Sequence, residues 1–242
     1  MAYESLAKER LAAEPKPCIS GTPKCIYIFF LLTLISVCIS QNLYASDDWK
    51  LIKNADDIEV YVRPHKNSKI DECKGIITIP VSIDIIYAII SYAPLHKKLM
   101  HTCYDSFLVR PWEKGCQIHY FTFKAPWPIW DRDLIYETCA KLERETGNVV
   151  VTSRVVEDAS VPVKNKIVRV TDSDNTWILE KIGPDKTRVT YRNYFNPGVA
   201  KVVPNKFINI ICKDVPFYTL INMRNLAKEP IYKELAPKYH LE

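Results

Sequence analysis

The residues of this chain best suited to chemistry are its histidines and acidic side chains. His96 and His101 lie five positions apart, a spacing that does not align two side chains on one helix face for a metal ion. His96 follows Pro94 in a polar stretch, which predicts an exposed helix end. The sequence has no G-x-S-x-G or H-E-x-x-H motif and no close carboxylate pair beside an evident base. We therefore expect no catalytic residue and no metal site.

The cysteines show no pattern of a metal site or of a disulfide framework. Eight cysteines are few for a chain of 242 residues. Five of them follow residue 45, and an odd number leaves at least one thiol unpaired within the chain. None has C-x-x-C or paired zinc-ligand spacing. We expect these five cysteines to be buried and to pack as small apolar side chains: Cys73, Cys103, Cys116, Cys139 and Cys212.

Charge and glycine content exclude several classes of binding protein. The chain is 48% apolar, enough for a core, and its net charge of +5 comes from 33 Lys and Arg against 28 Asp and Glu. The signs alternate, whereas nucleic-acid-binding domains show basic runs or stripes. The six glycines are scattered, so no phosphate-binding loop or dinucleotide fingerprint is present. We therefore expect neither a nucleic-acid partner nor a cofactor.

Most of the chain after residue 46 shows the pattern of strands. Alternation of apolar and polar residues predicts them, and turns with Gly147 and with residues 183–185 separate several of them. The order of strands, helix, many antiparallel strands and a long C-terminal helix is an α+β pattern with one curved sheet. The expected strands are 49–52, 58–63, 69–79, 106–111, 116–124, 133–142, 149–156, 166–170, 177–182 and 187–195, with a hairpin turn at 112–115.

Two amphipathic helices are predicted. Ser82 is a good N-cap for the first, and apolar residues recur at helical spacing over 83–90. The second begins near Pro204 and keeps one apolar stripe as far as Tyr218. Pro216 should kink this helix, because proline lacks the backbone N–H that a helix interior needs.

The N-terminal region has the features of a targeting segment. Residues 26–39 carry no charge, and these 14 residues would span about 21 Å as a helix, short of the roughly 30 Å hydrocarbon core. Basic residues precede the run and acidic residues follow it, which predicts a cytoplasmic N-terminus. A buried core helix is disfavoured because the run is apolar all round. We expect a signal peptide or signal anchor over residues 1–45. A single domain over 46–242 should then lie outside the cytoplasm, periplasmic or secreted, or be anchored through residues 26–39.

The stretch KAPWPIWDRDLIY, residues 124–136, resembles the PWP-x-x-x-RD signature of the StAR-related lipid-transfer (START) family. Trp49 followed by IEVYVR resembles the family's opening strands, and Trp177 followed by TRVTYRNYFNPG its last two strands. VPNKFIN and VPFYTLINMRNL are similar to the C-terminal helix of phosphatidylcholine-transfer members. The resemblance, over residues 48–239, implies a helix-grip fold. In that fold a curved antiparallel sheet wraps around the long C-terminal helix and encloses an internal apolar tunnel for one lipid.

The resemblance also implies which residues line the tunnel. Cholesterol-binding relatives carry a paired acid and base on two strands, where this chain has His119 and Thr138; a slip of two positions would bring in Gln117. The missing charged pair favours phospholipid over sterol. Strand alternation adds neighbours on the same faces. The expected tunnel residues are Gln117, His119, Phe121, Phe123, Tyr136, Thr138, Tyr191, Asn193, Ile208, Ile211 and Val215.

The loop between these two strands is expected to form the gate of the tunnel. Family geometry places Trp127 and Trp130 beside the C-terminal helix at the tunnel mouth, and tryptophan suits a membrane interface because its ring is amphipathic. The alternative is that one of the two fills the core. For Arg132 and Asp133 we expect a structural salt bridge that braces the loop.

Three functions follow from these residues. The first is a monomeric, non-enzymatic domain that binds one lipid and transfers it at a membrane surface. The second is a helix-grip enzyme resembling polyketide cyclases, which a buried acid or base on the His119 face would favour. The third is a small-ligand sensor whose gate loop recruits another protein.

Overall fold

The computed structural model describes residues 49–66, 68–198 and 204–239, without the side chains of residues 205, 207, 211 and 212. The chain divides into two units, Met1–Asp48 and Trp49–Glu242. The signal segment expected over residues 1–45 lies outside the described residues. Within the described ranges, no helix has both the length and the apolar character that crossing a membrane requires.

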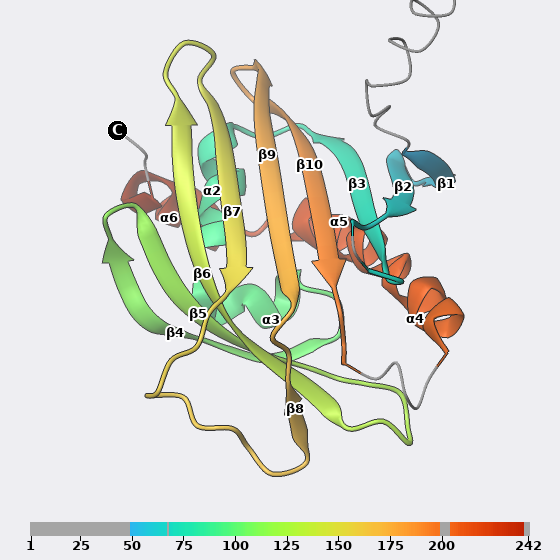
Figure 1. Cartoon of the computed structure of the whole chain (residues 1–242). Coiled ribbons are helices and arrows are strands. Elements are labelled where there is room, and N and C mark those ends of the chain that lie inside the picture. Colours follow the sequence, from blue (N-terminus) through green and yellow to red (C-terminus); the bar gives the residue numbers. More distant parts are fainter. Residues whose placement is uncertain (1–48, 67, 199–203, 240–242) are drawn as a thin grey trace, which may run out of the picture. The chain divides into compact units, whose positions relative to one another are not determined.

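One curved, mainly antiparallel sheet forms the body of the second unit (Figure 1). Nine strands follow the order β1-β2-β3-β10-β9-β7-β6-β5-β4, and β8 pairs with β6 in parallel. The structure confirms the α+β class and the curved antiparallel sheet expected from the sequence. The strands are β1 (Lys50–Ala55), β2 (Ile58–Pro64), β3 (Asp71–Ile79), β4 (Cys103–Glu113), β5 (Cys116–Phe123), β6 (Asp131–Glu143), β7 (Asn148–Val155), β8 (Ile167–Arg169), β9 (Ser173–Gly183) and β10 (Lys186–Phe195).

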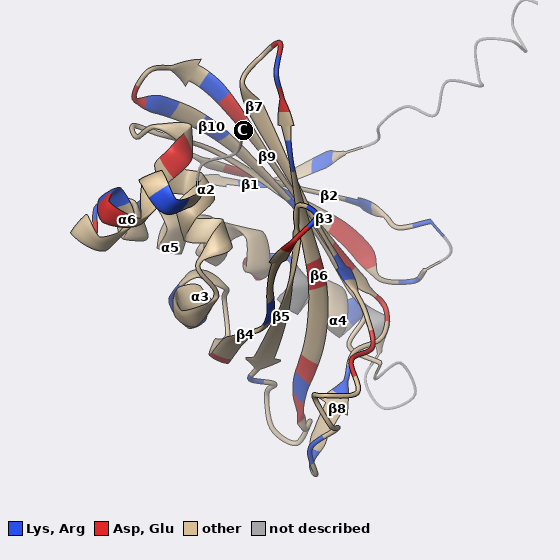
Figure 2. Ribbon diagram, turned by 90° about the vertical axis from the view of Figure 1, so that its left-hand side faces the viewer, with Lys and Arg blue, Asp and Glu red and all other residues tan. Residues whose placement is uncertain are grey.

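The helices α2, α3, α5 and α6 lie together on one face of the sheet (Figures 1 and 2). Apolar residues of α2 and α5 pack against this inner face in the main core cluster, which includes Trp177 and Leu220. The helices are α2 (Ile83–Ser91), α3 (His96–Leu99), α4 (Asn205–Cys212), α5 (Asp214–Leu226) and α6 (Pro230–Leu235), with the 3-10 turns η2 (Ala93–Leu95) and η3 (Ala236–Tyr239).

The C-terminal helix is interrupted earlier than the sequence suggested. We expected one long helix kinked at Pro216, but α4 ends at Cys212 and α5 begins at Asp214. Pro216 therefore lies in the first turn of α5, where its missing N–H removes no hydrogen bond. The proline begins a new helix instead of bending an existing one.

Two cysteines form a disulfide, so the expectation of buried apolar residues is wrong for Cys116 and Cys139. They lie directly opposite each other on β5 and β6, a pairing that depends on strand register and not on sequence spacing. Cys73 and Cys103 are buried, as expected. The side chain of Cys212 lies outside the described set.

Helix α5 lies directly against β3 at Gly75. A Cβ atom added to Gly75 would lie 2.6 Å from Leu220 Cδ1 and 3.0 Å from Pro216 Cβ. A Cβ atom fits there only if the Leu220 side chain changes its rotamer and Pro216 gives way slightly, or if the helix moves. The glycine therefore sets how closely α5 approaches the sheet.

We expect Gly75→Ala to lower the free energy of unfolding by about 1–3 kcal/mol, the usual scale of overpacking in a core. Gly183→Ala is the matched control, because its new Cβ would meet Lys186 Cβ at an ordinary 3.5 Å. Urea denaturation of both variants gives the comparison. Equal stability of the two variants would show that α5 does not depend on this contact.

Candidate functional site

An apolar cavity of about 530 Å³ lies between the inner face of the sheet and the segment from α4 to α5. Strands β5, β6, β9 and β10 contribute one wall, and residues of α4 and α5 contribute another. The loops 100–102 and 124–129 complete the lining. The volume falls within the range of about 300–1,000 Å³ that small-molecule sites occupy.

The structure brings six of the predicted tunnel residues to this cavity. Two loop residues that the sequence analysis missed, Met100 and Ile129, also line it. No alternation pattern marks these two, because they lie in loops. Contact of any lining residue with a lipid stays a prediction. The six predicted residues on the wall are Phe123, Tyr136, Tyr191, Asn193, Ile208 and Val215.

Four other predicted tunnel residues are buried but lie outside the cavity lining. Phe121 packs against Phe123, with ring centroids 6.0 Å apart, and against Tyr136 at 5.8 Å. Both of those neighbours line the cavity, so Phe121 packs behind the wall and supports it. The side chain of Ile211 is not among those described. Besides Phe121, the buried residues outside the lining are Gln117, His119 and Thr138, which lie farther along β5 and β6.

Two histidines are packed together behind Phe121. His96 is buried, so the expected exposed helix end is wrong: Nε2 of His96 donates a hydrogen bond of 2.6 Å to the Ile90 carbonyl oxygen. Its ring lies 5.0 Å from that of His119. Burial lowers the pKa of His96 to about 4 and the pKa of His119 well below its usual value. Both rings are therefore neutral at pH 7.

Uncharged polar groups form one part of the cavity wall. Asn193 Nδ2 donates to Asn175 Oδ1 at 2.6 Å, and the Tyr191 hydroxyl reaches the same oxygen at 3.4 Å. The hydroxyls of Tyr136 and Ser173 share a hydrogen bond of 2.5 Å. Burial raises the pKa of both tyrosines well above the usual range, so they stay neutral hydrogen-bonding groups. The sequence analysis missed Asn175 and Ser173 because it began this strand only at Trp177, whereas β9 begins at Ser173.

The 124–130 loop is fixed at its base and exposed at its tip. The Asp131 carboxylate accepts a hydrogen bond from the Ala125 N–H at 3.1 Å and pairs with Lys124 Nζ at 2.9 Å. Trp127 is 93% exposed and Trp130 is 57% exposed, so neither fills the core. The loop presents two indole rings to solvent beside the cavity.

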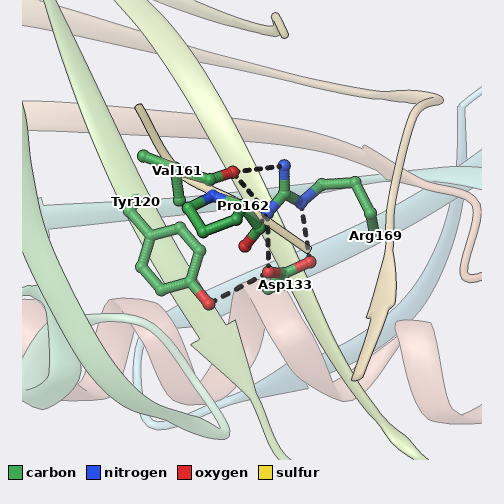
Figure 3. A network of polar contacts seen from close by, with 5 residues as sticks. All are labelled: Tyr120, Asp133, Val161, Pro162 and Arg169. Carbon is green, nitrogen blue, oxygen red and sulfur yellow. Dashed lines mark hydrogen bonds and ion pairs between the residues drawn. The ribbon is translucent and has the colours of Figure 1, made fainter. Parts of the chain in front are cut away.

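The Arg132-Asp133 pair does not form the expected salt bridge. Neighbouring strand residues point to opposite faces of the sheet. Asp133 instead pairs with Arg169, at 2.8 Å and 3.0 Å, and accepts a hydrogen bond of 3.0 Å from the Tyr120 hydroxyl (Figure 3). Arg169 also donates to the carbonyl oxygens of Val161 and Pro162, and so holds that segment against β6.

Arg132 lies on the cavity side of β6. Its Nε donates to the Pro197 carbonyl oxygen at 3.2 Å, and its Nη1 donates to the Trp130 carbonyl oxygen. One side chain thereby links the 124–130 loop to the segment that follows β10. Both segments border the cavity.

Comparison with known proteins agrees with this architecture. No profile of a known protein family matches the chain. An uncharacterized protein of Pseudomonas aeruginosa is 25% identical over 185 residues, which is 76% of this chain and 89% of that protein. A STAR-related lipid transfer protein of Xanthomonas axonopodis is 27% identical, with a TM-score of 0.68 over 76% of this chain and 100% of its own. Human STARD10 is 16% identical, with a TM-score of 0.69 over 84% of this chain and 83% of its own. The fold is START-like.

Acidification should destabilise the domain through the two buried histidines. The folded-state pKa of His96, about 4, lies below the ordinary 6.5, so the unfolded chain binds more protons between these values and stability falls as the pH falls through them. His119 acts in the same direction. Each histidine contributes up to about 1.4 kcal/mol per pH unit.

We expect the double variant His96→Gln and His119→Gln to show a shallower loss of unfolding free energy than the wild type between pH 6.5 and 5. Urea denaturation at several pH values measures both slopes. Identical slopes would mean that the two imidazoles are protonated as readily in the folded state as in the unfolded state.

Proposed function

We propose that this domain binds one lipid in its cavity and carries it between membranes without catalysis. The observation that carries the proposal is the apolar cavity itself, with Phe123, Ile129, Phe195, Ile208 and Val215 on its wall. Covering the apolar wall with hydrocarbon removes its surface from water, which is favourable by about 25 cal/mol per Å². An occupant of the cavity therefore stabilises the fold.

The energetics of lipid burial suit a carrier. A sixteen-carbon chain gains roughly 13 kcal/mol on leaving water, at about 0.8 kcal/mol per CH₂. In a bilayer the same chain is already surrounded by hydrocarbon, so its transfer from bilayer to cavity changes the free energy little. Exchange is then limited by opening of the cavity. The Xanthomonas axonopodis protein, a STAR-related lipid transfer protein by name, supports a carrier role for this chain.

An enzyme of the cyclase type has less support. Such an enzyme would need an acid or a base on the cavity wall. Within the described ranges, the wall carries neither Asp nor Glu, and His96 and His119 lie behind Phe121 in their neutral forms. His101 lines the cavity, its ring stacks on Tyr218 at 4.8 Å, and burial lowers its pKa, so this neutral imidazole is the candidate base that an enzyme would have among the described lining residues. The carrier needs none of these groups.

We also infer where the domain works and what it prefers. The Cys116–Cys139 disulfide supports an extracytoplasmic location, because disulfides persist in oxidising compartments. The sequence similarity to phosphatidylcholine-transfer members supports a phospholipid over a sterol. For the oligomeric state we propose a monomer, in which the described lining residues belong to one chain.

We propose that the domain docks on a membrane through the end of the cavity that the 124–130 loop borders. Trp127 and Trp130 are exposed there, and Ile210 of α4 is 53% exposed. Lys124 belongs to the same loop, and its side chain is 65% exposed. Exposed indoles next to a cation fit the interface of a membrane with anionic lipids.

The transfer of fluorescent phosphatidylcholine between liposomes tests this function. We expect the wild type to transfer the lipid, and Trp127→Ala with Trp130→Ala to slow transfer several-fold, because two interfacial anchors are lost. Melting temperature should hardly change, since both rings are largely exposed. Ile182→Ala is the matched control: it removes an apolar side chain that is 49% exposed, at the β9–β10 hairpin.

Two results would count against the proposal. No transfer by the folded wild type would refute the carrier function. A wild-type rate in the double tryptophan variant would remove the 124–130 loop from membrane docking.

A further inference from the structure

The cavity has an uneven charge. Lys124 and Arg132 line it, and across the part of the chain that the structure describes no carboxylate shares that lining. Lys124 is paired with Asp131 at 2.9 Å and is largely exposed. Arg132 is only 4% exposed, and among the described residues no acidic oxygen lies within ion-pair distance of it.

The acids that neighbour Arg132 in sequence are engaged elsewhere. Asp133 lies on the other face of β6 and is held by Arg169 and Tyr120 (Figure 3). The two oxygens of Asp131 accept from the Ala125 N–H and from Lys124. Asp131 acts on Arg132 only through its nearby charge, and neither carboxylate forms a direct ion pair with the guanidinium.

The hydrogen bonds of Arg132 include no carboxylate among the described residues. They go to two neutral carbonyl oxygens, of Pro197 and Trp130, through Nε and Nη1. A buried charge is costly without a counterion. A guanidinium has further N–H donors in a fixed planar fork, which matches the two oxygens of a carboxylate or phosphate.

Apolar side chains adjoin this cation in the same cavity. Phe123 lies opposite Arg132 across the β5–β6 pair, and Phe195, Ile208 and Val215 complete that part of the wall. One charged group beside a large apolar surface is the arrangement that an anionic amphiphile requires. An uncharged head group would leave the guanidinium unpaired, whereas the phosphate of a phospholipid head group, zwitterionic or anionic, can bind it.

We propose that the occupant of the cavity carries an acidic group, a carboxylate or a phosphate ester, that binds Arg132 while its hydrocarbon part lies against the apolar wall. This inference rests on the proposed lipid-binding function and names the ligand class for the same cavity. The acid supplies the direct ion pair that no described side chain makes with Arg132.

A series of ligands that share one hexadecyl chain and differ only in the head group tests the assignment without any mutation. Hexadecanoate, hexadecyl phosphate, hexadecanol and hexadecylamine compete, below their micelle concentrations, against a fluorescent lipid at pH 7.5. We expect the two anions to bind about tenfold to a hundredfold more tightly than the alcohol, the scale of a hydrogen bond to a charged group. The amine should bind most weakly. Displacement by inorganic phosphate at the same concentration would overturn the assignment to an amphiphile.

Variants then locate the interaction. Arg132→Gln should remove most of the preference for hexadecanoate over hexadecanol, and Arg132→Lys should retain part of it. Lys181→Gln, an exposed lysine at the end of β9, is the control for loss of one positive charge and should keep the full preference. If Arg132→Gln does not fold, the head-group series on the wild type still decides.

The outcomes distinguish failure of the acidic-ligand inference from failure of the proposed lipid-binding function on which it rests. Equal affinity of the wild type for hexadecanoate and hexadecanol would overturn the acidic ligand and leave lipid binding intact. Failure of every hexadecyl compound to bind would refute the lipid-binding function as well.

Discussion

The close contact between α5 and β3 at Gly75 determines where this domain keeps an internal space. Leu220 and Pro216 lie against the glycine, so helix and strand leave no room there. The helical segment is interrupted one turn earlier, between α4 and α5. Ile208 and Val215, on either side of this interruption, face the cavity together with strands β6, β9 and β10. Tight packing at one level of the sheet thus leaves an apolar cavity at the next.

A single dipeptide serves both faces of the sheet near this cavity. Asp133 is fully buried on the outer face, where Arg169 and Tyr120 satisfy it and the 161–169 segment is held in place. Arg132 lies on the inner face and links the two chain segments that border the cavity. Because Arg169 pairs with Asp133 from outside, Arg132 makes no ion pair with that aspartate and, among the described residues, with no other carboxylate. Fold stability and ligand chemistry are therefore divided between adjacent residues.

The order of elements followed from the sequence, because periods of two and 3.6 residues depend on local burial alone. Alternation also placed Phe123, Tyr136, Tyr191 and Asn193 on the correct face. It could not show that Phe121 lies behind the cavity wall, because all inward-facing residues of a strand share the same pattern whether or not they line a cavity.

Long-range contacts account for the sequence predictions that were wrong. His96 lies in a polar stretch, yet tertiary packing buries it against Phe121 and His119. The Cys116–Cys139 bond depends on the register of β5 and β6. The partner of Asp133 is 36 residues away on β8, and no local pattern connects them.

The central claim, that the cavity of each chain holds one lipid, is tested most directly by native mass spectrometry of protein purified from the organism that makes it. We predict one bound small molecule per chain, which organic solvent extracts and tandem mass spectrometry identifies as a lipid. Protein of bare polypeptide mass in spectra that preserve non-covalent complexes, or a bound molecule without a hydrocarbon chain, would contradict the account.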